Sequence, residues 1–535
     1  MGVKFEVSSS GRAMLSRPAA NKMTRDAFYK RASLVLFVVL TVLVLLTFPQ
    51  YGISWDEPIQ HSYSELVLRF YTSFFTDFSA AGYSDLKYYG GFFELISRLM
   101  TLNLPFGIYE TRHLANALSG LIGIFGCWKL ARSLSTPGSA FWAPLLLALY
   151  PSYYGHMFIN PKDIPFAALY VWSLYYLVQV IKEFPGVSLK TGAKFGFAAG
   201  LTLGVRVGGF LLLCYLYLLI VVLIAHWLLY RQSEAVSGRS VALKSLTISV
   251  WATLIAYAVM LAFWPYAVIK PFLRPFQALA WFSREAEPSP ISYIPSHLFA
   301  KLPELALVLA AIGLCAGIRV LYSRGLSKEF ATTLSYCLVA FSVVFPLVYA
   351  IVTQPRLYDE VRHFLFVAPP LFCLLGITMN NLVEGVLKKG ASFRLVLMVP
   401  AAYLVFQIVL MVKLHPYEYA YYNQFVGGVA GAAQKGYLTE YWATSYKEAV
   451  EKLTRYFQTA DGKAFETKQY KILLGHANYL ASYYFPANFV EVKSVSEADV
   501  YLTTTRWGLE PYRGTTIVEV GRFGTAFAVG KRLER

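Results

Sequence analysis

The sequence predicts an all-α polytopic membrane protein with a small α/β domain outside the membrane. Of the 535 residues, 56% are hydrophobic and only 15% are charged, and the mean hydropathy is +0.48. Soluble proteins carry about 25% charged residues. Many uncharged runs approach the roughly 20 residues needed to cross a bilayer. After Lys413 the composition becomes polar and rich in tyrosine, and no further apolar run follows.

The N-terminal part predicts a cytoplasmic tail over residues 1–31 and a first span near 32–48. Lys30 and Arg31 directly precede that span, and basic residues favour the cytoplasmic side. No small-residue cleavage site follows, so we expect an uncleaved anchor. The next loop, residues 49–110, is long, acidic and interspersed with aromatic residues, which is typical of helices that lie on the membrane surface.

With the first span, about eleven transmembrane helices are predicted between residues 32 and 412. Segment 193–207 is short and glycine-rich, so either a full crossing or a re-entrant helix is expected there. The remaining predicted spans cover residues 113–130, 139–155, 164–181, 208–230, 245–267, 303–321, 331–352, 363–382 and 394–412.

Alternation of these spans places most basic clusters between the spans on the cytoplasmic side, as in a protein of the plasma (inner) membrane. Because the net charge of +17 is spread between apolar runs, nucleic acid is not an expected partner. Residues 413–535 are predicted to form a periplasmic domain. It should contain a helix over 445–457 and strands over 468–474, 498–504, 515–520 and 525–529.

An acidic pair, Asp56 and Glu57, directly follows the first span. Pro58 suits the start of a helix, where the carboxylates would meet the positive end of the helix dipole. In such a helix Glu57, His61 and Glu65 are spaced four apart and share one face. A general base with a supporting neighbour is the functional interpretation, and a charged helix start is the plain structural one.

The other conspicuous polar residues are predicted on this same external side. Ionisable groups at membrane depth are costly, so their gathering indicates a site, although each could simply end a helix. Arginine suits phosphate because its guanidinium binds oxygens in a bidentate way. Arg206 could alternatively be a snorkelling side chain. Besides Asp56, Glu57, His61 and Glu65, the candidates are Arg112, His113, His156, Asn160, Lys162, Asp163, Arg206, Arg356, Asp359, Glu360, Arg362 and His363.

Several kinds of chemistry lack a sequence motif. The chain has no P-loop, no glycine-rich dinucleotide motif and no His/Cys metal cluster, and its five cysteines lie in apolar runs. A soluble nucleotide donor therefore has no evident site. A lipid-linked substrate that arrives already activated on the external side fits better.

The motifs resemble the GT-C glycosyltransferases that use polyprenyl-phosphate sugars, in the group of protein O-mannosyltransferases and lipid A aminoarabinose transferases. The resemblance covers most of residues 30–425. It rests on WDEP at 55–58, Arg112-His113, HMFINPKDIP at 156–165 and RHFLFVAPP at 362–370. HPYEYAYYN at 415–423 is similar to a stretch of other bacterial members.

This resemblance implies an integral-membrane glycosyltransferase of GT-C-like fold that acts on an acceptor lipid, glycan or protein. It implies that Asp56 takes the proton from the acceptor, with Glu57 beside it. Arg362 would contact the lipid phosphate. From the chemistry of their side chains, and not from the resemblance, His363, Arg356, Lys162 and Arg206 are further candidates for binding the donor phosphate. Asp163 would be a second acidic site near the donor or a divalent metal. The remaining candidates would support the site or the acceptor.

Two other classes of function stay open from the sequence. A transporter or lipid flippase would require polar groups near mid-membrane and internal symmetry. A non-catalytic membrane subunit would use its C-terminal domain to bind a partner. The enzyme hypothesis requires that the Asp56 segment and the Arg356–His363 segment meet in space.

Overall fold

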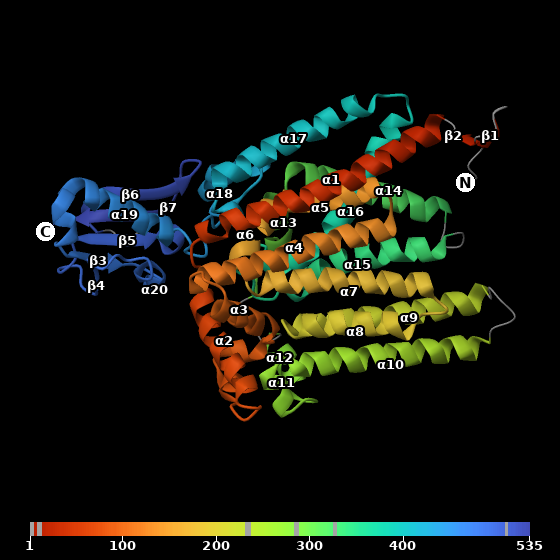
Figure 1. Ribbon diagram of the computed structural model, residues 1–535, viewed down its shortest axis with the longest axis horizontal. Coiled ribbons are helices and arrows are strands. Elements are labelled where there is room, and N and C mark those ends of the chain that lie inside the picture. Colours follow the sequence, from red (N-terminus) through yellow and green to blue (C-terminus); the bar gives the residue numbers. More distant parts are fainter. Residues whose placement is uncertain are drawn as a thin grey trace.

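The computed structural model describes residues 5–7, 13–15, 17–230, 237–282, 288–324, 329–508 and 512–534. Long helices run side by side through most of the molecule, and a smaller unit with a β-sheet lies at one end of them (Figure 1). The predicted tail 1–31 is described only in part. Within it, α1 (Arg17–Thr47) already begins before the first apolar run.

Eight helical segments of the described chain are long and apolar enough to cross a membrane. They confirm a multi-pass membrane protein but correct the predicted eleven spans. A ninth would be the pair α13 (Tyr293–Lys301) and α14 (Glu304–Arg324), which bends by 117°. The eight segments contain α1, α4 (Ile108–Leu134), α7 (Asp163–Glu183), α9 (Phe210–Tyr230), α10 (Gly238–Ala262), α15 (Phe330–Thr353), α16 (Ala368–Leu387) and α17 (Phe393–Leu414).

Two predicted spans are not single helices of spanning length. Segment 139–155 is divided into α5 (Pro137–Ala148) and α6 (Pro151–Ile159), because Pro151 lacks the backbone N–H needed to continue the first helix. Segment 193–207 corresponds to α8 (Leu189–Leu203), whose 15 residues are too few to cross. Hydropathy overlooked the break at Pro151, whereas for the short, glycine-rich segment 193–207 the sequence allowed either a full crossing or a re-entrant helix.

The chain beyond α8 is irregular and accepts backbone hydrogen bonds from the loop between α1 and α4 (Ile108–Leu134). The backbone N–H of Gly90 donates to Val205 O at 3.1 Å, and that of Phe92 donates to Gly204 O at 3.0 Å. Gly90 is required here because a Cβ would lie 1.9 Å from Gly204 O. This close joint satisfies backbone groups that an apolar surrounding would leave unpaired, and it fixes Arg206 beside the loop.

The loop between α1 and α4 contains two helices, α2 (Glu57–Thr72) and α3 (Phe92–Asn103). They pack on each other and lie beside the ends of the long helices, near α11 (Pro265–Ile269) and α12 (Arg274–Phe282) (Figure 1). The helices predicted for this loop are therefore present. Their arrangement carries the Trp55–Glu57 turn to the end of the helix bundle that faces the sheet unit.

The C-terminal unit contains a mixed five-stranded sheet in the order β4-β3-β5-β7-β6. The central strand β5 (Val500–Thr504) is buried along its whole length, and α19 (Tyr446–Asp461) packs on β6 and β7. All predicted strands and the helix are present, and β4 was missed. The other strands are β3 (Tyr470–Leu474), β4 (Phe489–Val492), β6 (Gly514–Arg522) and β7 (Thr525–Leu533).

Between α17 and α19 the chain folds against the ends of the long helices. It includes α18 (Gly428–Gln434). Asn423 Nδ2 donates to Leu302 O at 2.9 Å, and the buried Lys301 Nζ donates to Tyr419 O at 3.1 Å. The sheet unit is therefore attached to the bundle by a packed segment rather than by an open linker.

Candidate active site

Asp56 lies in a tight turn that starts α2, between the bundle and the sheet unit. The backbone N–H of Glu57 donates to Ser54 O at 3.0 Å, which closes the turn. Asp56 Oδ2 forms an ion pair with Lys162 Nζ at 2.9 Å. Its side chain keeps 23% of its surface exposed. The carboxylate is thus held in place but remains reachable by another molecule.

Lys162 and Asp163 occupy the start of α7, in a turn organised by Asn160. Asn160 Oδ1 accepts from the Asp163 N–H at 3.0 Å, and its Nδ2 donates to Asp163 Oδ2 at 2.9 Å. An asparagine that bonds the backbone beyond it favours such turns. Asp163 also forms an ion pair with Arg206. The segment 160–163 therefore presents a cation and an anion toward the same place.

Arg362 is distant from Asp56 and Asp163 in the sequence but lies close to both carboxylates in the structure. Its Nη1 lies 3.9 Å from Asp56 Oδ2 and 3.6 Å from Asp163 Oδ2. Only 5% of its side chain is exposed. The condition set by the sequence, that the Asp56 and Arg362 segments meet, is satisfied.

The balance of charge sets the protonation of this cluster. Burial opposes the charged form of Asp56, but Lys162 and Arg362 outweigh it and hold the pKa of Asp56 below its ordinary value. Burial likewise disfavours the ammonium of Lys162, yet Asp56 outweighs it and raises the pKa of Lys162. Both groups are ionised at neutral pH. The cluster is a salt-bridge network with a partly exposed edge.

This donor set suits an anion better than a divalent metal. In the described part of the chain, no three His, Cys, Asp or Glu side chains are grouped to hold a metal ion. The carboxylates of Asp56 and Asp163 already face Lys162, Arg206 and Arg362. A metal ion would have to displace these cations, whereas a phosphate would be attracted by them.

Glu57 points away from Asp56 and stabilises the fold of the turn. Its buried carboxylate accepts from the Ser54 N–H at 2.7 Å and lies 3.2 Å from His113 Nε2. His61 and Glu65 continue along α2 on the same side, where Glu65 pairs with Arg98 of α3 at 3.0 Å. The shared face exists, but it is turned toward α3 and α4 rather than toward Lys162.

Arg112 belongs to this supporting layer as well. It is buried on α4 and pairs with Glu94 of α3 at 2.8 Å, while its Nη1 donates to Ser97 Oγ at 3.0 Å. The Gln60 side chain, oriented to donate to Glu94 Oε1 at 3.2 Å and to accept from Lys162 Nζ at 3.1 Å, links the two layers. Arg112 thus acts on the cluster only through neighbours.

The remaining predicted residues lie at different distances from the cluster. His156 is buried between the 160–163 turn and Tyr441, whose hydroxyl lies 3.0 Å from His156 Nε2. His363 stacks edge-on against Tyr358 at 4.8 Å between ring centroids. Arg356 is exposed and forms no ion pair among the described residues. The structure does not bring Arg356 into the network.

Sequence reasoning assigned no role to four residues that contact the network. The ring of Tyr89 lies 5.2 Å from Lys162 Nζ and 5.6 Å from the Arg206 guanidinium. Asp359 pairs with Arg362, Trp442 donates to Asp359, and Arg506 also pairs with Asp359. Asp359 was among the polar residues predicted on the external side, but it was given no separate role. Trp442 and Arg506 lie in the polar C-terminal region and carry no motif.

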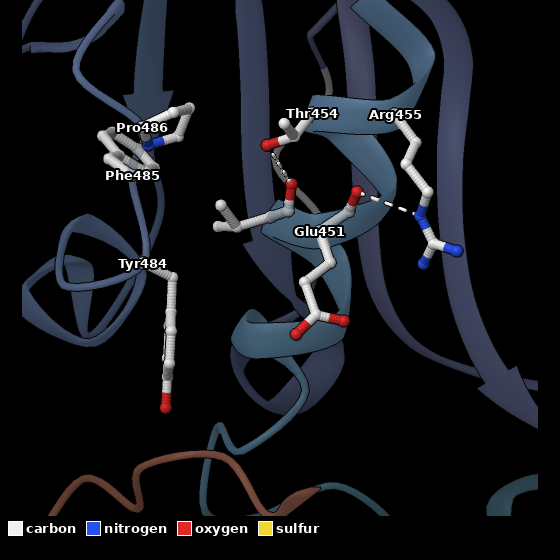
Figure 2. A pocket seen from close by; sticks show the side chains of 7 residues that line it. Glu451, Thr454, Arg455, Tyr484, Phe485 and Pro486 are labelled. Atoms are coloured by element: carbon white, nitrogen blue, oxygen red, sulfur yellow. Dashed lines mark hydrogen bonds between the residues drawn. The ribbon is translucent and has the colours of Figure 1, made fainter. Parts of the chain in front are cut away.

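A separate open pocket of about 510 Å³ lies on the sheet unit, away from these charges (Figure 2). It is formed by one face of α19 and by the segment Tyr484–Pro486, with Glu451 and Arg455 at its border. The pocket contains none of the predicted site residues. The candidate site is therefore defined by the charged cluster.

Comparison with known proteins agrees with the motifs. The dolichyl-phosphate-mannose-protein mannosyltransferase family matches residues 110–243, which include Lys162, Asp163 and Arg206. No curated protein matches the chain.

Solved structures similar to the chain include ArnT from Cupriavidus metallidurans, in the apo state (TM-score 0.49) and bound to undecaprenyl phosphate (TM-score 0.47). Both are 14% identical, and each comparison covers 93% of this chain and 97% of that one. The apo oligosaccharyltransferase of Archaeoglobus fulgidus is 12% identical with a TM-score of 0.43, over 86% of this chain and 65% of that one. The family match over residues 110–243 agrees with the predicted resemblance to glycosyltransferases that use polyprenyl-phosphate sugars, and it covers part of the membrane helices of this chain.

Proposed function

We propose that the protein transfers a sugar from a polyprenyl-phosphate donor to an acceptor at the charged cluster, with inversion at the anomeric carbon. The observation that carries the proposal is the meeting of Asp56 with Arg362, at 3.9 Å, beside Lys162 and Asp163. A partly exposed carboxylate next to excess cations suits a reaction that needs a base and releases a phosphate. The donor class follows from the name of the matching family, which acts with dolichyl-phosphate mannose.

In this reaction the acceptor oxygen attacks the anomeric carbon while Asp56 removes its proton. The bond from that carbon to the phosphate oxygen breaks, and the lipid phosphate leaves with the electron pair on the opposite face. The transition state is oxocarbenium-like. General-base help contributes roughly 10²–10⁴ in rate. Asp56 is the proposed base.

The cations have two roles in the proposal. Arg362, Lys162 and Arg206 stabilise the negative charge that develops on the leaving phosphate, an electrostatic contribution that is often the largest in catalysis. Lys162 also pairs with Asp56 in the free protein. When it turns to the donor phosphate, Asp56 loses a neighbouring cation and becomes a stronger base.

The periplasmic face is the proposed side of the reaction, because the basic residues of the sequence favour a cytoplasmic location of the opposite bundle end. The cluster also lies at one end of the bundle, beside the sheet unit, which a mid-membrane transport site would not require.

A direct assay tests the proposal. Purified protein is incubated with a panel of polyprenyl-phosphate sugars and with lipid, glycan and peptide acceptors, and the anomeric configuration of the product is determined by NMR. We expect transfer from one donor class with inversion. Retention of configuration, or transfer that Asp56→Asn leaves intact, contradicts the proposed mechanism.

A further inference from the structure

We propose that Arg506, from the C-terminal sheet unit, is a positioning residue of the active site that acts through Asp359 and Trp55. This inference rests on the proposed function and adds a part of the chain that the membrane helices do not supply. Asp359 is buried with no exposed side-chain surface, and its Oδ1 lies 2.7 Å from Arg506 Nη2. Its other oxygen, Oδ2, lies 3.3 Å from Arg362 Nε. One carboxylate therefore connects Arg506 with the arginine beside the base.

The turn that carries Asp359 cannot hold its shape alone. Asp359 and Glu360 have φ values of 57° and 62°, in the left-handed region that costs free energy for residues other than glycine. Such strain persists only where the surroundings hold it. Trp442 Nε1 donates to Asp359 at 3.0 Å, and the Leu438 N–H donates to Glu360 at 3.0 Å. Arg506 supplies the charged contact in this support.

Arg506 also contacts the residue before the base. Its guanidinium lies 4.2 Å from the centroid of the Trp55 ring, a geometry in which a cation is attracted to the ring face. The Tyr479 hydroxyl of the same unit donates to Trp55 O at 3.0 Å. Arg506 therefore contacts a neighbour of each residue of the Asp56–Arg362 pair. These neighbours are Trp55, which precedes Asp56, and Asp359, which pairs with Arg362.

The backbone around Arg506 is suited to this task. Arg506 follows the central strand β5, in the short 3-10 turn Thr505–Trp507. Thr505 Oγ1 donates to Ala526 O at 3.0 Å, which fastens the turn to β7. The end of a central strand is a rigid base for a side chain that must fix another group to within a fraction of an ångström.

The test compares two variants of the full chain in the transfer assay. Arg506→Gln removes the positive charge that pairs with Asp359. We expect kcat to fall about 100-fold, because a displacement of a catalytic group by about 1 Å costs a factor of that order. Lys447→Met is the matched control. Lys447 joins the same unit to the loop through Tyr51 O at 3.4 Å and touches neither Asp359 nor Trp55. We expect its kcat to stay within about twofold of wild type.

Further measurements separate positioning from simple attachment of the sheet unit. Melting temperature and limited proteolysis should be alike for both variants. Arg506→Lys should recover part of kcat. In a double-mutant cycle Arg506→Gln should add little to Asp359→Asn, since both act on one contact. Equal losses in Arg506→Gln and Lys447→Met, or wild-type kcat in Arg506→Gln, overturn the inference and leave the proposed function standing. Absence of transfer by the wild-type protein from every donor overturns both.

Discussion

Arg362 lies 3.9 Å from Asp56, although a loop after the first span supplies one and the start of a late span supplies the other. Asp56 and Arg362 were predicted as site residues from separate segments of the sequence, and this contact brings them together. It also places the proposed base where a leaving phosphate would be neutralised. The predictions below examine each contribution to this arrangement.

Asp56→Asn should abolish transfer while the fold is retained. The amide cannot take the acceptor proton, so kcat should fall by roughly 10²–10⁴. Steady-state kinetics and the melting temperature in detergent are the two measurements. Asp85→Asn, which alters an exposed carboxylate of the same loop, serves as the control and should behave as wild type. Near-normal activity of Asp56→Asn would remove this residue from the role of base.

Glu57→Gln should lower the stability of the protein and leave the rate of the reaction nearly unchanged. Its buried carboxylate accepts from Ser54 and faces His113, so the amide loses charge-assisted contacts worth about 1–3 kcal/mol. We expect a lower midpoint of unfolding, with kcat per folded molecule changed only a few fold. A variant as stable as wild type but inactive would show that Glu57 takes part in the reaction.

Arg362→Lys should raise the KM for the donor about 10-fold and also lower kcat. Lysine keeps the charge but loses the planar fork that lies between Asp56 and Asp163 and that is proposed to bind the donor phosphate. Product inhibition by the sugar-free polyprenyl phosphate should weaken in parallel. The exposed Arg394 at the start of α17 provides the control Arg394→Lys. Unchanged donor kinetics in Arg362→Lys would exclude a contact between Arg362 and the donor.

Lys162→Met should move the acid limb of the activity–pH profile to a higher pH. Lys162 is the stronger of the two cations that lower the pKa of Asp56, Arg362 remains in the variant, and Asp163 opposes both. Without Lys162 the pKa of Asp56 rises, so protonation removes the base at a higher pH. The measurement is log(kcat/KM) against pH. An acid limb at the wild-type position would contradict control of Asp56 by Lys162.

His61→Gln should make the protein less sensitive to acid. Burial, with Arg112 and Arg98, outweighs Glu65 and lowers the pKa of His61 from 6.5 to about 4. Between these pH values the unfolded chain binds a proton that the folded chain does not, so stability falls as the pH drops through this window. The melting temperature of the variant should vary less between pH 6.5 and 4. An identical slope in both proteins would contradict this origin of the sensitivity.

The sequence allowed much of the site to be predicted because costly charges in an apolar chain are conspicuous. Asp56, Lys162, Asp163, Arg206 and Arg362 were all nominated in this way, and the structure brings them together. Periodicity also predicted the shared face of Glu57 and Glu65. It could not show which way that face is turned, because the orientation depends on contacts with α3 and α4.

Other features depend on contacts between distant parts of the chain, which no local pattern reveals. Arg506 lies in a polar region where an arginine is ordinary, and only its ion pair with the distant Asp359 distinguishes it. The count of eleven spans failed for a different reason. Hydropathy records apolar length but not the breaks at Pro151 and beyond Gly204.

The strained turn at Asp359 and Glu360 has a consequence for how the protein matures. Asp359 in this turn is contacted by Trp442 and Arg506, which are synthesised only after the last long helix, α17. A chain with every membrane helix already inserted would still lack the fixed arrangement of Arg362. With Arg506 in its proposed role, insertion of the membrane helices and completion of the candidate site are separate events, and the second requires the C-terminal unit to be folded.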